Sequence, residues 1–151
     1  MGKIYFAYGS NMKIDRMSKR APSTKLLGYA KIRDHQLVFN KISRDGSGKA
    51  NIVESNSSVV FGVLFDIEEQ DILRLDDYEK GYDKQDITVI DHDERPLNAF
   101  TYISTQVKEG LIPFDWYLEM ILQGAIENKL PKYYVENLRK FESVPDIRKK
   151  K

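Results

Sequence analysis

Two short stretches of this sequence carry residues that could bind or transform a small molecule. The first is Tyr8-Gly9-Ser10-Asn11, which follows an apolar run and precedes a segment with helical spacing. Glycine permits a tight turn, and successive backbone N–H groups in such a turn form a cradle for a carboxylate or an oxyanion. An ordinary strand-to-helix turn, with Asn11 as the helix cap, fits the same residues. Ser10 as a nucleophile is a third interpretation, but the Gly-x-Ser-x-Gly elbow is missing, and His35 is the only base nearby in the sequence.

The second stretch ends in Glu79, directly after an acidic segment over residues 68–78. The helical spacing of its apolar side chains places Tyr78 and Glu79 on the inward face and turns Asp76 and Asp77 toward solvent. A carboxylate on an inward face has either a partner or a raised pKa. A solvated helix face is the plainer alternative, and periodicity alone does not decide between the two.

Three other motifs predict no site. Gly46-Ser47-Gly48-Lys49 resembles part of a phosphate-binding loop but lacks the earlier glycine and the following hydroxyl that such a loop requires. Asp91-His92-Asp93-Glu94 holds metal-type ligands, yet neighbouring strand residues point to opposite faces, so a solvated turn is favoured and no metal site is predicted. The basic run Arg148–Lys151 has no interleaved aromatic residues and is typical of a solvent-exposed end.

The segments that must position these residues show two kinds of apolar spacing, one typical of strands and one typical of helices. Apolar groups typical of strands occur at 3–8, within 26–42, and at 50–53, 59–67, 86–90 and 98–104, and helical spacing occurs at 13–20, 68–78, 114–125 and from Pro131 onward. The short connections favour antiparallel pairing, which predicts an α+β fold. Gly62 inside its strand suggests a bulge or a close backbone approach. We expect one domain over residues 1–144 and a basic, flexible tail over 145–151.

Composition narrows the class of protein further. The chain has 151 residues, no cysteine and a formal net charge of +1. A hydrophobic content of 41% with 11% aromatic residues excludes a disordered chain. The lack of cysteine excludes a disulfide scaffold and a thiol nucleophile. The near-neutral charge provides no overall field to recruit nucleic acid or a membrane surface, and no apolar stretch approaches the roughly 20 residues of a membrane span. With no export signal, a cytoplasmic protein is expected.

A series of short motifs in collinear order resembles the γ-glutamylcyclotransferase family, which includes the AIG2-like proteins. The resemblance covers residues 3 to about 138 and is carried by Tyr5-Phe6-Ala7-Tyr8-Gly9-Ser10-Asn11-Met12, Arg20-Ala21-Pro22-Ser23, Gly28-Tyr29-Ala30, Ala50-Asn51-Ile52, Val60-Phe61-Gly62-Val63, Leu75-Asp76-Asp77-Tyr78-Glu79, Thr101-Tyr102, Tyr117, Gly124-Ala125 and Leu130-Pro131. The family implies a small, mixed, mostly antiparallel β-barrel flanked by helices. It also implies release of 5-oxoproline from a γ-glutamyl compound with no metal or cofactor.

The resemblance also implies roles for individual residues. Tyr8, Gly9, Ser10 and Asn11 match the loop that holds the substrate, with Tyr5, Phe6 and Ala7 completing the segment, and Glu79 matches the catalytic acid/base. The α-amine of a γ-glutamyl group can close a ring on its own γ-carbonyl, and one carboxylate can move both protons. The loop N–H groups can bind the α-carboxylate or the oxyanion.

The residues after Glu79 depart from the family pattern. Lys80 stands where glycine commonly follows the glutamate, and Tyr82 comes directly after Gly81. The sequence therefore does not decide which leaving group the protein accepts. The substrate can be a γ-glutamyl amino acid, a γ-glutamyl amine or a γ-glutamyl-protected metabolite, and glutathione is less favoured. Two alternative functions also stay open, a non-catalytic protein that binds γ-glutamyl compounds or 5-oxoproline and a Ser10-dependent amide hydrolase. The sequence leaves a homodimer possible.

Overall fold

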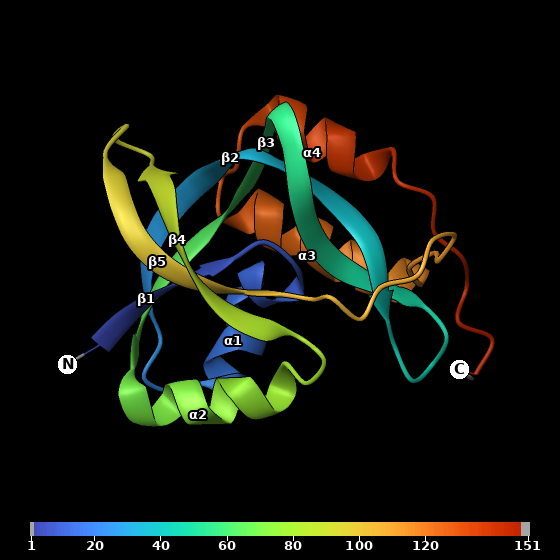
Figure 1. The fold of residues 1–151 in the computed structure, drawn as a ribbon, viewed down its shortest axis with the longest axis horizontal. Helices are drawn as coiled ribbons and strands as arrows, with labels where there is room; N and C mark the ends of the chain where they lie inside the picture. Colours follow the sequence, from blue (N-terminus) through green and yellow to red (C-terminus); the bar gives the residue numbers. More distant parts are fainter. Residues whose placement is uncertain (1, 149–151) are drawn as a thin grey trace.

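The computed structural model describes residues 2–148, and five strands form a closed barrel at its centre (Figure 1). The strands are β1 (Gly2–Ala7), β2 (Lys25–Ile42), β3 (Gly48–Glu68), β4 (Asp83–Asp91) and β5 (Pro96–Ile103), and they are neighbours in the order β1-β3-β2-β4-β5. All neighbouring pairs are antiparallel except β1 and β5, which run parallel and meet at Tyr5 and Phe100. The predicted α+β fold with a mostly antiparallel barrel is confirmed.

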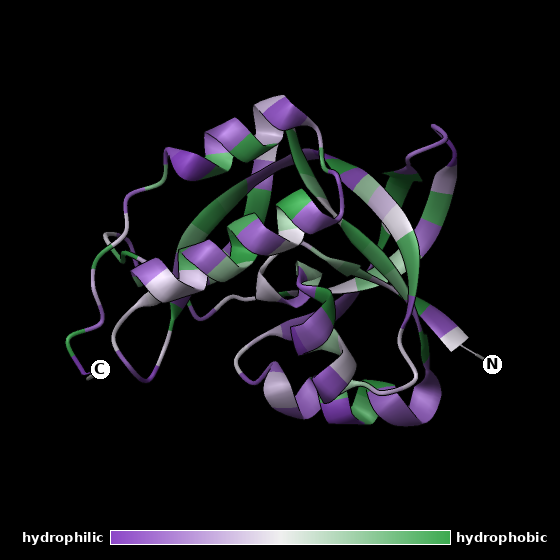
Figure 2. Cartoon of the chain, turned by 180° about the vertical axis from the view of Figure 1, so that it is seen from behind, coloured by the Kyte–Doolittle hydropathy of each residue, from purple (hydrophilic) through white to green (hydrophobic). Residues whose placement is uncertain are grey.

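Helices cover two sides of the barrel. A 3₁₀ turn, η1 (Ser10–Met12), leads into α1 (Ile14–Arg20), which lies beside α2 (Glu69–Tyr78). The helices α3 (Asp115–Glu127) and α4 (Lys132–Arg139) pack on the face that is turned to the viewer in Figure 2. The stripe expected from residue 114 onward faces inward, because its side chains Tyr117, Leu118, Ile121, Leu122 and Ala125 are buried.

The segments predicted as two strands, 50–53 and 59–67, are one strand of 21 residues in the structure. Between them residues 55–58 have no partner on β2, because the register of the strand pair shifts there, and none of their side chains is buried. Gly62 lies in regular register opposite Ala30, so it does not form a bulge. A Cβ at Gly62 would lie 2.4 Å from the carbonyl oxygen of Ala7. The close-approach interpretation is therefore the correct one.

The turn after β1 is held from two directions. Asn11 does not cap α1, because Lys13 occupies the N-cap position and the first helical N–H, that of Ile14, donates to Glu127 Oε2 at 2.7 Å. A Cβ at Gly124 would come within 2.8 Å of backbone atoms of Lys13 and Met12, so α3 packs directly against the turn. This packing fixes the backbone of the predicted binding loop and leaves the Asn11 side chain free for another role.

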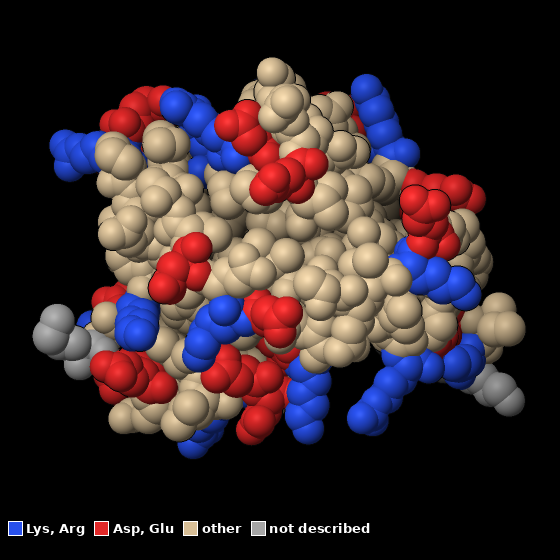
Figure 3. All heavy atoms as spheres, in the orientation of Figure 1, with Lys and Arg blue, Asp and Glu red and all other residues tan. Residues whose placement is uncertain are grey.

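The charged surface carries both signs. On the face in Figure 3, acidic and basic side chains alternate, most densely over α2 at the lower edge, which agrees with the near-neutral net charge. Arg148, expected in a flexible tail, pairs with Asp146 at 2.9 Å and lies 5.2 Å from the centre of the Phe114 ring, and residues 149–151 lie outside the described part of the chain. Among the described helices, none is long and apolar enough to cross a membrane.

Candidate active site

The two stretches singled out in the sequence meet at one small cavity. Its lining comes from β1 and the turn that follows, from the start of β3, from the end of α2 and from β5, and consists of Tyr5, Tyr8, Gly9, Asn11, Ala50, Glu79, Tyr82 and Tyr102. Its volume is about 20 Å³, which is room for about one water molecule. Glu79 is the only acidic side chain in this lining.

Three of the predicted binding residues do not line the cavity. Phe6 and Ala7 are fully buried in the core behind it, where the Phe6 carbonyl accepts a hydrogen bond from Thr101. The Ser10 hydroxyl accepts a hydrogen bond from Arg16 Nε at 3.1 Å. Alternating residues of a strand point to opposite sides, so β1 can present Tyr5 to the cavity only by turning Phe6 away from it. These three residues therefore support the loop from behind.

Glu79 lies at the C-terminal end of α2, where its N–H donates to the carbonyls of Leu75 and Asp76. Gly81, with a φ of +89°, turns the chain away directly afterwards. The Glu79 side chain is 16% exposed and lies 3.4 Å from Arg20 Nη1. Burial raises the pKa of the Glu79 carboxyl, and the positive charges of Arg20, Arg16 and Lys41 oppose this rise without cancelling it. A buried carboxyl with a raised pKa is suited to accepting and returning a proton.

Arg20, on α1, connects Glu79 to the binding loop. The same Nη1 donates to Asn11 Oδ1 at 3.1 Å, and Asn11 Nδ2 donates to the Tyr5 hydroxyl at 3.1 Å. The guanidinium also lies 4.7 Å from the centre of the Tyr78 ring, which is 55% exposed rather than inward as predicted. No role was predicted for Arg20. Its like-charge spacing of four residues from Arg16, which a helix by itself disfavours, is the sequence signal that could have indicated one.

Further hydrogen bonds fix the aromatic walls of the cavity. Tyr8 donates to the carbonyl of Tyr102, and Tyr82 donates to the carbonyl of Ala50 at 2.7 Å. Tyr102 donates to Asp76 Oδ1 at 2.6 Å, while Lys84 donates to the other carboxylate oxygen at 3.1 Å. The prediction that Asp76 faces solvent is therefore wrong, because a side chain from β5 reaches over to it. Burial raises the pKa of all three phenols, so they stay protonated.

No arrangement for a nucleophilic serine is found in residues 2–148. Ser10 is bonded to Arg16, and His35 lies on β2 with its Nδ1 at 2.8 Å from the carbonyl of Arg33. Over the same residues, no three His, Asp or Glu side chains gather closely enough to hold a metal ion. The carboxylate of Glu79 is thus the group in this cavity that can accept a proton, because the phenols of Tyr8, Tyr82 and Tyr102 stay protonated.

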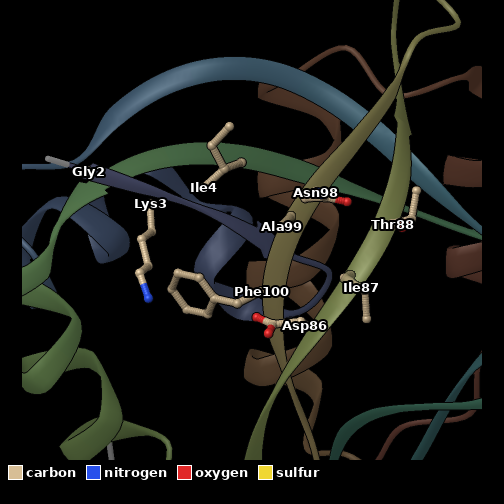
Figure 4. Close-up of a pocket in the computed structure, with 9 residues that line it drawn as sticks. All are labelled: Gly2, Lys3, Ile4, Asp86, Ile87, Thr88, Asn98, Ala99 and Phe100. Carbon is tan, nitrogen blue, oxygen red and sulfur yellow. The ribbon is translucent and has the colours of Figure 1, made fainter.

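A larger groove of about 680 Å³ lies outside this cavity, between the start of β1 and the β4–β5 hairpin (Figure 4). Lys3 and Asp86 are its only charged lining residues. Phe100 lines the groove and stacks on Tyr5, which lines the cavity, with 5.3 Å between ring centres. This aromatic pair therefore borders both the groove and the cavity.

Comparison with known proteins gives one consistent result. The model of the AIG2-like family matches residues 59–138. The γ-glutamylcyclotransferases of Mus musculus and Homo sapiens are 32% and 30% identical to this chain over 148 residues, which covers 92% of this chain and 78% of each relative. A solved γ-glutamyl cyclotransferase structure superimposes with a TM-score of 0.90 at 28% identity, covering 100% of this chain and 93% of the other. The chain therefore belongs to the AIG2-like family of γ-glutamylcyclotransferases.

Proposed function

We propose that this protein is a γ-glutamyl cyclotransferase in which Glu79 moves the protons of the reaction. The observation that carries the proposal is the position of Glu79, a largely buried carboxyl with a raised pKa in the same small cavity as the Tyr8-Gly9 turn. The named relatives support this class of enzyme. The reaction is an intramolecular acyl transfer, which releases 5-oxoproline and a free amine or amino acid.

The chemistry requires few groups from the protein because the substrate carries its own nucleophile. The α-amine attacks the γ-carbonyl carbon and closes a five-membered ring, and Glu79 takes the proton that the amine loses. The tetrahedral intermediate then collapses, the bond to the leaving nitrogen breaks, and Glu79 returns its proton to that nitrogen. Holding the chain in the attacking conformation can correspond to an effective molarity of about 10⁵–10⁸ M. The loop at Tyr8–Asn11 supplies this orientation.

Identification of the product tests this function against its alternatives. The protein is incubated with a panel of γ-glutamyl amino acids and γ-glutamyl amines, and the products are identified by mass. We expect 5-oxoproline and the free amine in equal amounts. Free glutamate would instead indicate a Ser10-dependent hydrolase, and binding without any product would indicate a non-catalytic relative. The panel also ranks the leaving groups by the rate at which each substrate is converted.

We also propose that the reaction needs no metal or cofactor. The support is chemical, since one carboxyl and hydrogen-bond donors are sufficient for each step, and the cavity lining offers a single acidic side chain. The turnover rate after dialysis against a strong chelator is expected to equal the rate before it. A loss of activity that a divalent cation restores would contradict this part of the proposal.

A further inference from the structure

The tyrosines that line the cavity differ in where their hydroxyl protons point. Tyr8 and Tyr82 donate to backbone carbonyls, which can only accept, and Tyr102 donates to a carboxylate of Asp76 that Lys84 also contacts. The protons of these three hydroxyls are therefore directed into the protein. Tyr5 is the remaining tyrosine of the lining, and its hydroxyl is bonded differently.

The hydrogen bond of Tyr5 has only one possible direction. The guanidinium of Arg20 has no acceptor, so the atom of Asn11 that faces it at 3.1 Å must be the amide oxygen. The amide nitrogen then faces Tyr5, and since this nitrogen can only donate, the Tyr5 oxygen accepts. Arg20 thus fixes Asn11, and Asn11 leaves the proton of Tyr5 unused.

Among the described residues, this accepted bond is the only hydrogen bond of the Tyr5 hydroxyl. Tyr5 is 4% exposed, and burial together with the nearby charge of Glu79 raises the pKa of its phenol, so the proton is retained. A buried donor without an acceptor is unfavourable and rare in folded proteins. Because this donor lines the cavity that also contains Glu79, its missing acceptor is expected to come from the substrate.

We infer that Tyr5 is a catalytic residue that donates a hydrogen bond to the γ-carbonyl oxygen of the substrate as this oxygen becomes an oxyanion. The inference rests on the proposed function. Glu79 must reach both the attacking and the leaving nitrogen, which flank the γ-carbonyl carbon, so its neighbour Tyr5 faces the same centre. The α-carboxylate of the substrate would be repelled from this position by the like charge of Glu79.

The step balances without a further reactant. When the amine attacks, the electron pair of the carbonyl π bond moves onto oxygen, and the negative charge that Glu79 loses on protonation appears there. Tyr5 keeps its proton and only donates a hydrogen bond. The two consecutive hydrogen bonds, from Arg20 to Asn11 and from Asn11 to Tyr5, polarise the Tyr5 hydroxyl, because linked hydrogen bonds strengthen one another. The pair then returns to the C=O bond as the leaving nitrogen departs.

The first test is Tyr5→Phe, assayed with a γ-glutamyl substrate from which the unaltered protein releases 5-oxoproline. Loss of one oxyanion donor typically reduces kcat by about 10²–10³-fold, and KM is expected to stay within about threefold. Tyr134→Phe is the matched comparison, because it removes the hydroxyl of a similarly buried tyrosine on α4 that does not line the cavity. It should lose far less kcat. Thermal melting of each variant checks the fold.

A second variant tests the inference with Tyr5 in place. Asn11→Asp is nearly the same size, but its carboxylate can accept from both Arg20 and Tyr5, which turns the Tyr5 proton away from the cavity. We expect a loss of kcat similar to that of Tyr5→Phe, and no further loss when the two are combined. Losses that multiply, or a Tyr5→Phe variant within about threefold of the unaltered kcat, would overturn the inference. Neither result affects the proposed function, which fails only if the unaltered protein releases no 5-oxoproline.

Discussion

Glu79→Gln is expected to lower the rate of 5-oxoproline release by about 10²–10⁴-fold, the usual contribution of a positioned acid–base group. Glutamine has the shape of glutamate and can still accept the hydrogen bond from Arg20, but it cannot take up the proton of the attacking amine. The loss should therefore appear in kcat, with little change in KM. Steady-state kinetics with product detection by mass measure it directly.

Asp77→Asn is the control for this substitution. Asp77 lies on the same helix two residues away, its side chain is exposed, and no role in the cavity involves it. Its activity should equal that of the unaltered protein. Asp76→Asn is unsuitable as a control because Asp76 accepts the hydrogen bond from Tyr102. Near-full activity in Glu79→Gln, with a loss in Asp77→Asn, would assign the proton transfer to another group.

Although Glu79→Gln is expected to lower activity, it is expected to leave the stability of the fold unchanged or to increase it. Because folding raises the pKa of Glu79, the folded chain binds the proton more tightly than the unfolded chain does. The resulting penalty is absent below the ordinary glutamate pKa of about 4.3, grows as the pH rises toward the raised value, and is complete above it. Glu79→Gln removes this penalty. Its melting temperature should match or exceed that of the unaltered protein at pH 8, with the difference vanishing at low pH.

The second large effect is expected for Arg20→Met. This change removes the cation at 3.4 Å from Glu79 and the hydrogen bond to Asn11. A hydrogen bond to a charged group contributes about 1.5–3 kcal/mol, so kcat should fall by about 10- to 100-fold. The pKa of Glu79, which Arg20 lowers, should rise further, and because the ionised form accepts the proton, the acidic limb of the kcat profile should move to higher pH.

Arg20→Lys separates the charge from the geometry. Lysine keeps the positive charge near Glu79, so the acidic limb should stay close to its original position. It lacks the planar fork that reaches two acceptors at once, so part of the loss in kcat should remain. A kcat profile of Arg20→Met that coincides with that of the unaltered protein would show that Arg20 does not set the protonation of Glu79.

The sequence predicted the elements whose periodicity is uninterrupted and the residues adjacent to them. Glu79 was placed correctly because the inward stripe of α2 extends one residue past the helix. Asp76 and Tyr78 were misplaced because their surroundings come from elsewhere, with Tyr102 reaching Asp76 from β5 and Arg20 lying over Tyr78 from α1. Helical spacing describes which way a residue points and does not reveal what reaches it from a distant segment.

The sequence also could not show which groups donate and which accept the hydrogen bonds around Tyr5. A helix cap was one of the roles open to Asn11, because asparagine commonly caps helices, but Lys13 occupies that position and the Asn11 amide bonds Tyr5 and Arg20. The prediction divided β3 into two segments, and these correspond to the stretches that pair with β2 on either side of residues 55–58, where the register shifts. The interpretation of Asn11 failed because its partners come from β1 and α1, which local preference does not reveal.

The size of the cavity has a consequence for how ligands are measured. Its 20 Å³ hold about one water molecule, whereas a γ-glutamyl group is several times larger. If part of the lining must be displaced to admit such a group, a ligand binds only to the fraction of molecules in which this displacement has occurred. Measured dissociation constants equal the intrinsic constant divided by that fraction, and association is slowed in proportion. The measured affinity of an inhibitor or of the product then combines two free energies, that of displacing the cavity lining and that of the contacts the ligand makes in the cavity.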